Sequence, residues 1–104
     1  KAFDCSSLAY YAWKSAGIDI AFGGSTTAAA EAEGLKGKTF KEKDIQPGDL
    51  IFYNYTTNGR YKNISHVGIY VGNGKMVEAV DEAHGVCLGN YHNVGLVMIC
   101  RPGK

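Results

Sequence analysis

The stretch FDCSSLAYYAW, residues 3–13, decides the fold, because it places Cys5 where an extended segment turns into a helix. Apolar residues then recur at helical spacing, and a glycine follows that favours a left-handed helix end: Leu8, Ala9, Ala12, Trp13, Ala16 and Gly17. Free backbone N–H groups and the positive end of the helix dipole favour a thiolate in the first turn. The position suits a nucleophile, although an ordinary buried cysteine explains this helix equally well.

Length and composition predict one compact domain, residues 1–104. The chain has 45% hydrophobic and 12% aromatic residues, enough for a modest single core. Its formal net charge is +1, and it has neither a basic stripe nor a basic amphipathic helix. No apolar run approaches the roughly 18 residues of a spanning helix. We therefore expect no nucleic-acid partner and no membrane insertion.

The first residue and the cysteines bear on two questions, whether the chain is part of a longer protein and whether it contains a disulfide. The chain begins at Lys1, four positions before Cys5, so we expect a piece of a longer, multidomain chain whose export signal is not visible. Three cysteines are too few for a disulfide framework. Cys87 and Cys100 fall in neighbouring strand candidates, where a disulfide is geometrically possible in an exported protein and two buried thiols are the alternative.

The middle of the chain predicts a second helix and a charged connection. Ser25-Thr26-Thr27 can cap a short helix that runs to Glu33 and is closed by Gly34. We expect this helix to be small and largely exposed. Residues 36–44 are rich in charged side chains and are most simply a solvated loop.

The half after Pro47 has the pattern of β structure. A turn at 46–49 precedes an apolar run, and Gly72-Asn73-Gly74 favours a tight hairpin between two further runs. Strands are expected at 50–53, 66–71, 76–80, 86–88 and 96–100. Helices followed by an antiparallel meander predict an α+β fold with the first helix packed on one face of the sheet.

A cysteine nucleophile needs a base and a group that orients the base. His66 opens a strand directly after a polar loop, so its ring can lie at a strand end facing a cleft. His84 and His92 lie in loops without periodic support, and we expect both to be exposed.

Glu78 lies on the partner strand of the same hairpin. Pairing around the turn brings Glu78 and His66 to the same end of the hairpin, where a carboxylate can fix the imidazole tautomer. An outward-facing strand carboxylate is the plainer interpretation. In that case Asn90 or His92 is the next candidate for the third residue.

Three separated motifs stand in order along the chain: Asp4-Cys5-Ser6, QPGDLIFY at residues 46–53 and HVGIYVGNGKMV at residues 66–77. From Phe3 to Arg101 the sequence resembles the NlpC family of bacterial cell-wall cysteine peptidases. The resemblance implies a papain-like α+β core in which the N-terminal helix carries the nucleophile. It also implies cleavage of peptidoglycan stem peptides, usually between γ-D-glutamate and a diamino acid.

The same resemblance assigns a role to each matching residue. Cys5 matches the nucleophile, His66 the general base, and Glu78 the third polar residue, where relatives more often have histidine. Asp4 matches an aspartate that helps hold the free amino terminus of the substrate.

Two neighbours of the nucleophile complete the implied substrate-binding set, Ser6 and Ser7. Ser7 replaces the glycine usual in relatives and adds a side chain that narrows the cleft. Relatives also carry a tyrosine-containing segment just upstream of the nucleophile, whereas this sequence begins at Lys1 and lacks it. That segment is expected to matter for activity.

Two other functions remain open at this stage, a CHAP-like peptidoglycan amidase and a catalytically silent wall-binding module. A metal site is disfavoured because neither C-x-x-C nor H-x-x-x-H spacing occurs, and no cofactor is expected. The expected partner is a peptidoglycan peptide bound by a monomer. The resemblance places the protein outside the bacterial cell, in the wall, or on a phage particle.

Overall fold

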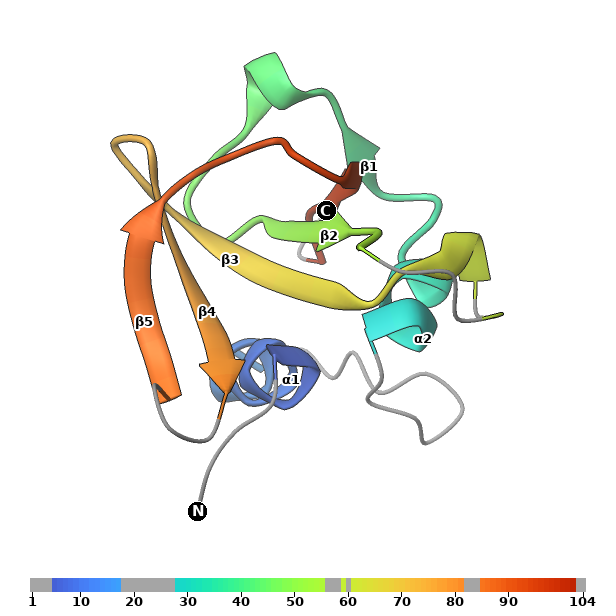
Figure 1. The fold of residues 1–104 in the computed structure, drawn as a ribbon, viewed down its shortest axis with the longest axis horizontal. Coiled ribbons are helices and arrows are strands. Elements are labelled where there is room, and N and C mark those ends of the chain that lie inside the picture. The colour runs from blue at the N-terminus through green and yellow to red at the C-terminus, as the bar shows by residue number, and fades with distance from the viewer. Residues whose placement is uncertain (1–4, 18–27, 56–58, 60, 82–84, 103–104) are drawn as a thin grey trace.

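The computed structural model of this chain describes residues 5–17, 28–55, 59, 61–81 and 85–102 (Figure 1). Its helices and 3-10 turns are α1 (Cys5–Ser15), α2 (Ala28–Gly34), η2 (Glu42–Asp44) and η3 (Tyr61–Asn63). Its strands are β1 (Thr39–Phe40), β2 (Leu50–Tyr53), β3 (His66–Gly72), β4 (Lys75–Asp81), β5 (Gly85–Asn90) and β6 (Leu96–Cys100). No helix in these ranges is long and apolar enough to cross a membrane.

The strands form one antiparallel sheet in the order β1-β6-β2-β3-β4-β5, which confirms the α+β prediction. Strands β2 to β5 follow one another as the expected meander. The prediction was wrong for β6, which crosses back to pair with β2 and β1. All four side chains of β2 are buried, so this strand is central and needs a partner on both edges.

Strand β1 lies inside the stretch that we expected to be a solvated loop. Thr39 pairs with Cys100 and Phe40 with Ile99, both on β6. The Arg101 guanidinium also lies 3.7 Å from the centre of the Phe40 ring. These contacts come from the far end of the chain, so a local charge pattern does not reveal them.

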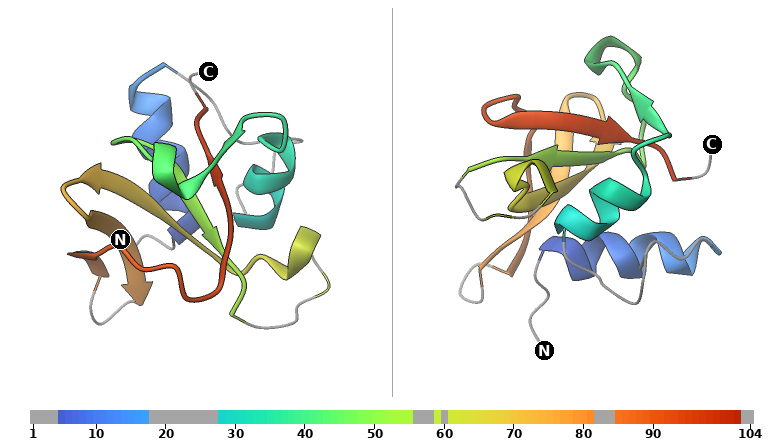
Figure 2. Two further views of the ribbon diagram at one scale, coloured as in Figure 1. Left: turned by 90° about the horizontal axis from the view of Figure 1, so that it is seen from above. Right: turned by 90° about the vertical axis from the view of Figure 1, so that its right-hand side faces the viewer.

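The sheet has a buried cluster on each face. Figure 2 shows α1 and α2 on the same side of the sheet, and their core members pack there with side chains of β2, β3 and β6. This larger cluster contains Ala9, Ala28, Ala29, Ala32, Leu35, Leu50, Phe52, Ile64, Val67 and Cys100. The opposite face holds a smaller cluster of Ile51, Tyr53, Met76 and Ile99.

Helix α2 is not the exposed helix that we expected. Ala28, Ala29, Glu31 and Ala32 are all buried, because α2 packs against α1, β3 and the η3 turn. Alanine side chains are short and permit this close approach, so an alanine-rich segment forms part of the core. The predicted cap, Ser25-Thr26-Thr27, lies outside the described residues.

Helix α1 is held against the rest of the fold by a buried alanine and by the indole of a tryptophan. Ala9 is fully buried, and the Trp13 indole donates a hydrogen bond of 3.1 Å to the Gly48 carbonyl. Gly17 follows the helix with φ of +94°, so the expected left-handed helix end is confirmed. The helix packs against β3 and β4, the two strands of the predicted hairpin.

That hairpin is confirmed in detail. Asn73 and Gly74 have φ of 55° and 73°, and two central residues with positive φ are the mark of a type I′ turn. The turn is local chemistry, which is why the sequence predicts it well.

A buried ion pair fastens the turn before β2 to the end of β6. Asp49 is 1% exposed, and its carboxylate accepts hydrogen bonds of 2.8 and 2.9 Å from Arg101. Arg101 also donates to the Asp44 carbonyl, and Asp49 accepts from the Gln46 backbone N–H. The predicted turn at residues 46–49 therefore also supplies a carboxylate that binds the chain to Arg101, about 50 residues later.

Cys87 and Cys100 do not form a disulfide. Cys87 lies on β5 and Cys100 on β6, and three strands separate them in the sheet. At about 4.8 Å per strand this is roughly 19 Å, whereas a disulfide needs Cα atoms within about 7 Å. The strands are neighbours in sequence only. Cys100 is buried and Cys87 half-buried, so the alternative of two buried thiols holds for one of them.

Candidate active site

The backbone of Cys5 begins helix α1, which confirms the expected first-turn position. The side chains of Cys5, Ser6 and Ser7 and the whole of Asp4 lie outside what the structure describes. Their chemical roles therefore stay predictions. The first turn of a helix presents backbone N–H groups without intrahelical partners, and these attract negative charge.

His66 and Glu78 form a hydrogen-bonded pair across strands β3 and β4. His66 Nε2 lies 2.5 Å from Glu78 Oε1, and the side chains are 13% and 20% exposed. Ile69 pairs with Val77, so the same register sets Glu78 opposite Gly68. His66 lies two residues before Gly68 on β3, and its side chain therefore points to the same face of the sheet as that of Glu78. The predicted proximity of His66 and Glu78 is confirmed.

The pair orients the imidazole ring. A carboxylate bound to Nε2 holds a proton on that nitrogen and leaves Nδ1, on the other side of the ring, to act as the base. Restricted exposure of both side chains strengthens the attraction between an imidazolium and a carboxylate relative to bulk water. The arrangement can therefore take up a proton from a nearby thiol and stabilise the resulting charge.

Two tyrosines enclose His66. The ring centres of Tyr53, Tyr55 and His66 form a nearly equilateral triangle, with distances of 5.5, 5.6 and 5.7 Å. Tyr53 is fully buried, and Tyr55 is 49% exposed. Neither tyrosine was predicted as a site residue, although the sequence held one signal for Tyr53. Tyr53 ends β2 as His66 begins β3, and the two are direct antiparallel partners.

The alternative third residues have other partners. His92 is half-buried rather than exposed, because its ring stacks on Tyr53 at 4.9 Å and its carbonyl accepts a hydrogen bond of 2.9 Å from the Tyr53 hydroxyl. The Asn90 side chain instead accepts a hydrogen bond from Lys75. His84 lies outside the described residues.

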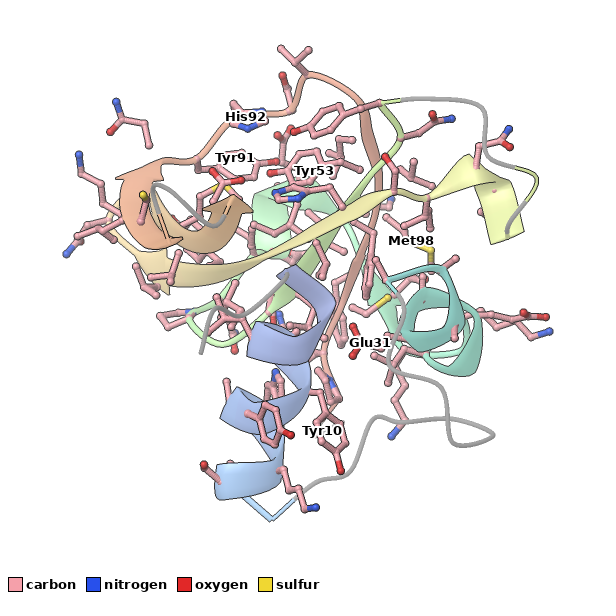
Figure 3. All side chains as sticks on the ribbon, turned by 60° about the horizontal axis from the view of Figure 1, so that its bottom comes forward. Tyr10, Glu31, Tyr53, Tyr91, His92 and Met98 are labelled. Carbon is pink, nitrogen blue, oxygen red and sulfur yellow. The ribbon has the colours of Figure 1, made fainter. Side chains whose placement is uncertain are left out.

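Figure 3 shows where the aromatic side chains around Tyr53 lie relative to the helices. Tyr53, Tyr91 and His92 gather on one side of the sheet, away from Tyr10 of α1 and Glu31 of α2. The Tyr53 hydroxyl also lies 3.4 Å from the Met76 sulfur. Among the residues with described positions, no group of three or more His, Cys, Asp or Glu side chains is placed to hold a metal ion.

Comparison with known proteins shows the family to which the chain is similar. The model of the NlpC/P60 family matches residues 1–97. A "Probable endopeptidase p60" of Listeria grayi is 38% identical over 93 residues, which are 89% of this chain and 16% of that protein. "Peptidoglycan DL-endopeptidase CwlO" of Bacillus licheniformis is 35% identical over 94 residues, which are 89% of this chain and 18% of that protein. The chain thus spans about a sixth of the length of these relatives.

Solved structures show the same fold. The P60 domain of an antigen from M. avium subspecies paratuberculosis has a TM-score of 0.75 and 28% identity, over 98% of this chain and 67% of that one. RipD from Mycobacterium tuberculosis has a TM-score of 0.72 and 25% identity, over 95% of this chain and 66% of that one. RipD is described as a non-catalytic NlpC/p60 domain protein adapted to peptidoglycan binding.

Proposed function

Because this chain belongs to the NlpC/P60 family, we propose that it is a cysteine endopeptidase that cuts peptidoglycan stem peptides between γ-D-glutamate and a diamino acid. The observation that carries the proposal is the 2.5 Å contact between His66 Nε2 and Glu78 Oε1 on the hairpin against which helix α1 packs. Curated relatives named as DL-endopeptidases support the choice of bond.

In the proposed reaction Cys5 is the nucleophile. His66 takes the thiol proton through Nδ1, and the thiolate attacks the carbonyl carbon of the scissile amide. The backbone N–H of Cys5 stabilises the oxyanion of the tetrahedral intermediate. The imidazolium then protonates the leaving amine, the carbon–nitrogen bond breaks, and an acyl-enzyme remains.

Water completes the cycle. His66 accepts a proton from water as the oxygen attacks the thioester carbonyl, and the carbon–sulfur bond breaks to release the acid product and regenerate the thiol. Glu78 keeps the imidazole in the productive tautomer throughout. Asp4 binds the amino-terminal end of the stem peptide, and Ser6 and Ser7 line the cleft beside the nucleophile.

The biological setting follows from the same proposal. The partner is the peptide of peptidoglycan, bound by one copy of the chain. The site of action is the bacterial wall or the space outside the cell.

A silent peptidoglycan-binding module is the second candidate, and the structural likeness to RipD favours it. The hydrogen-bonded pair of His66 and Glu78 favours the enzyme. A module that only binds peptide has no need of a base whose tautomer is fixed by a carboxylate. The two candidates differ in the chemistry of one thiol, which makes them separable.

The test digests purified sacculi with the wild-type chain and with Cys5→Ser, His66→Ala and Cys87→Ser. An amine-reactive dye then labels each newly exposed amino group. The endopeptidase exposes an amino group on the diamino acid in the wild type and in Cys87→Ser, which is the matched thiol control. Binding to sacculi without any new amine, together with no alkylation of Cys5 by iodoacetamide near neutral pH, supports the silent module instead.

A further inference from the structure

Tyr55 stands out because a half-exposed aromatic ring lies directly against the proposed base. Its ring centre is 5.6 Å from that of His66 with an angle of 29° between the planes, and 5.5 Å from that of Tyr53 with an angle of 16°. Tyr53 is fully buried and belongs to the core, whereas Tyr55 is 49% exposed. Packing of the core therefore accounts for Tyr53 and does not account for the placement of Tyr55.

The backbone around Tyr55 is built to hold the ring there. The Tyr55 backbone N–H donates to Ser65 Oγ at 3.2 Å, and the Asn54 backbone N–H donates to the Gly95 carbonyl at 2.8 Å. These two bonds tie the end of β2 to the residue before His66 on one side and to the residue before β6 on the other.

Gly95 makes room for the ring. A Cβ atom at Gly95 would lie 2.9 Å from a Tyr55 ring carbon and 3.0 Å from the Asn54 carbonyl oxygen. Real side chains almost never approach so closely, and the φ of +79° at Gly95 is itself unfavourable for other residues. The position of the Tyr55 ring thus depends on a glycine that lies 40 residues later in the chain.

We propose that Tyr55 is a positioning residue for His66, holding the plane of its imidazole so that Nε2 meets Glu78 and Nδ1 faces the nucleophile. This inference rests on the function proposed above. Rotation about the last side-chain bond of histidine is broad, and a single hydrogen bond at Nε2 fixes one atom without fixing the plane. A ring packed against the imidazole supplies the second constraint, and offset aromatic pairs of this geometry are attractive.

The proposal assigns the effect to the aromatic ring of Tyr55 and not to its hydroxyl. Tyr55→Phe should therefore behave like the wild type, and Tyr55→Leu should not. Tyr11 is the matched control, since it is a tyrosine of similar exposure, 51%, on the surface of α1. Both tyrosines are half-exposed, so their leucine variants should fold, which the midpoint of thermal unfolding will verify.

The kcat-against-KM split separates positioning from simple packing, and NMR reports whether the Tyr55 ring lies against His66. Tyr55→Leu should lower kcat on a stem peptide about tenfold to a hundredfold while KM changes less than about twofold, because misplacing a catalytic group costs rate more than binding. In NMR spectra the imidazole C–H resonances of His66 should move downfield in Tyr55→Leu as the ring current is lost. Tyr55→Phe and Tyr11→Leu should leave both kcat and these resonances close to wild type.

Unchanged kcat in a folded Tyr55→Leu would overturn the proposal, whether or not the His66 resonances move. An equal loss of kcat in Tyr55→Phe and Tyr55→Leu would overturn it as well, by assigning the effect to the hydroxyl. The NMR readout needs no substrate. If the wild-type chain hydrolyses no stem peptide, the endopeptidase function is refuted. A downfield shift of the His66 resonances in Tyr55→Leu would still show that the Tyr55 ring stacks on His66.

Discussion

Glu78 of β4 lies directly opposite Cys87 of β5, so the carboxylate that binds His66 has a thiol as its neighbour on the other strand. Opposite residues of an antiparallel pair share one face, with Cβ atoms about 5 Å apart. The cysteine that sequence analysis paired with Cys100 in one alternative instead lies beside the proposed active site.

This neighbour gives a graded test of the site. Cys87→Ser should keep kcat/KM within about twofold, because serine preserves the size and neutrality of the side chain. Cys87→Asp should lower kcat/KM by about tenfold or more, since like charges directly opposite each other repel and displace Glu78 from His66. Equal activity of the two variants, both folded by circular dichroism, would show that Cys87 does not face Glu78.

Glu78 should matter through its charge. Glu78→Gln keeps a hydrogen-bonding group on His66 but removes the negative charge, so turnover should fall on the order of ten- to a thousandfold. Glu78→His should recover part of the rate if the position is that of the third residue in relatives. Unchanged rates in Glu78→Gln and Glu78→Ala would make Glu78 a plain strand carboxylate.

Stability should fall in alkali. Burial raises the pKa of the Cys100 thiol from 9.0 to about 12 and also raises that of the Tyr53 hydroxyl above its usual 10.0. The unfolded chain therefore releases these protons from about pH 9 upward while the folded chain retains them, so the free energy of unfolding decreases as pH rises. Urea titrations between about pH 8 and pH 11 measure the decrease. A constant free energy across that range would contradict the burial of both groups.

The Asp49–Arg101 pair should hold β1, β2 and β6 together. Arg101→Met leaves a carboxylate buried without its partner, which should lower the midpoint of thermal unfolding by roughly 10–20 °C. Asp49→Leu combined with Arg101→Met removes the unpaired charge and should recover part of the loss. Differential scanning calorimetry of the three proteins decides the matter. A midpoint for Arg101→Met equal to that of wild type would mean that the pair contributes nothing to stability.

Local chemistry could be predicted from the sequence, and long-range pairing could not. The turn at Gly72-Asn73-Gly74 and the start of α1 at Cys5 depend on residues within a few positions, and both predictions were confirmed. The place of β6 between β1 and β2 depends on which strand pairs with the free edge of the central strand β2, and no residue near 96–100 specifies that pairing.

The candidate site divides in the same way. The closeness of His66 and Glu78 follows from one hairpin, so the sequence predicts it. The burial of His92 depends on Tyr53, and the seat of Tyr55 depends on Gly95, in each case about 40 positions away in the chain. Contacts of that span arise only from the completed sheet.

The most direct test of the account is mass spectrometry of a muramyl tripeptide, N-acetylmuramoyl-L-alanyl-γ-D-glutamyl-diamino acid, after incubation with the wild-type chain and Cys5→Ser. Parallel substrates carry meso-diaminopimelate or L-lysine. We predict that the wild type releases only the free diamino acid from at least one of them and that Cys5→Ser leaves both intact. Release of the intact tripeptide, which an amidase would produce, or equal turnover by Cys5→Ser would contradict the account.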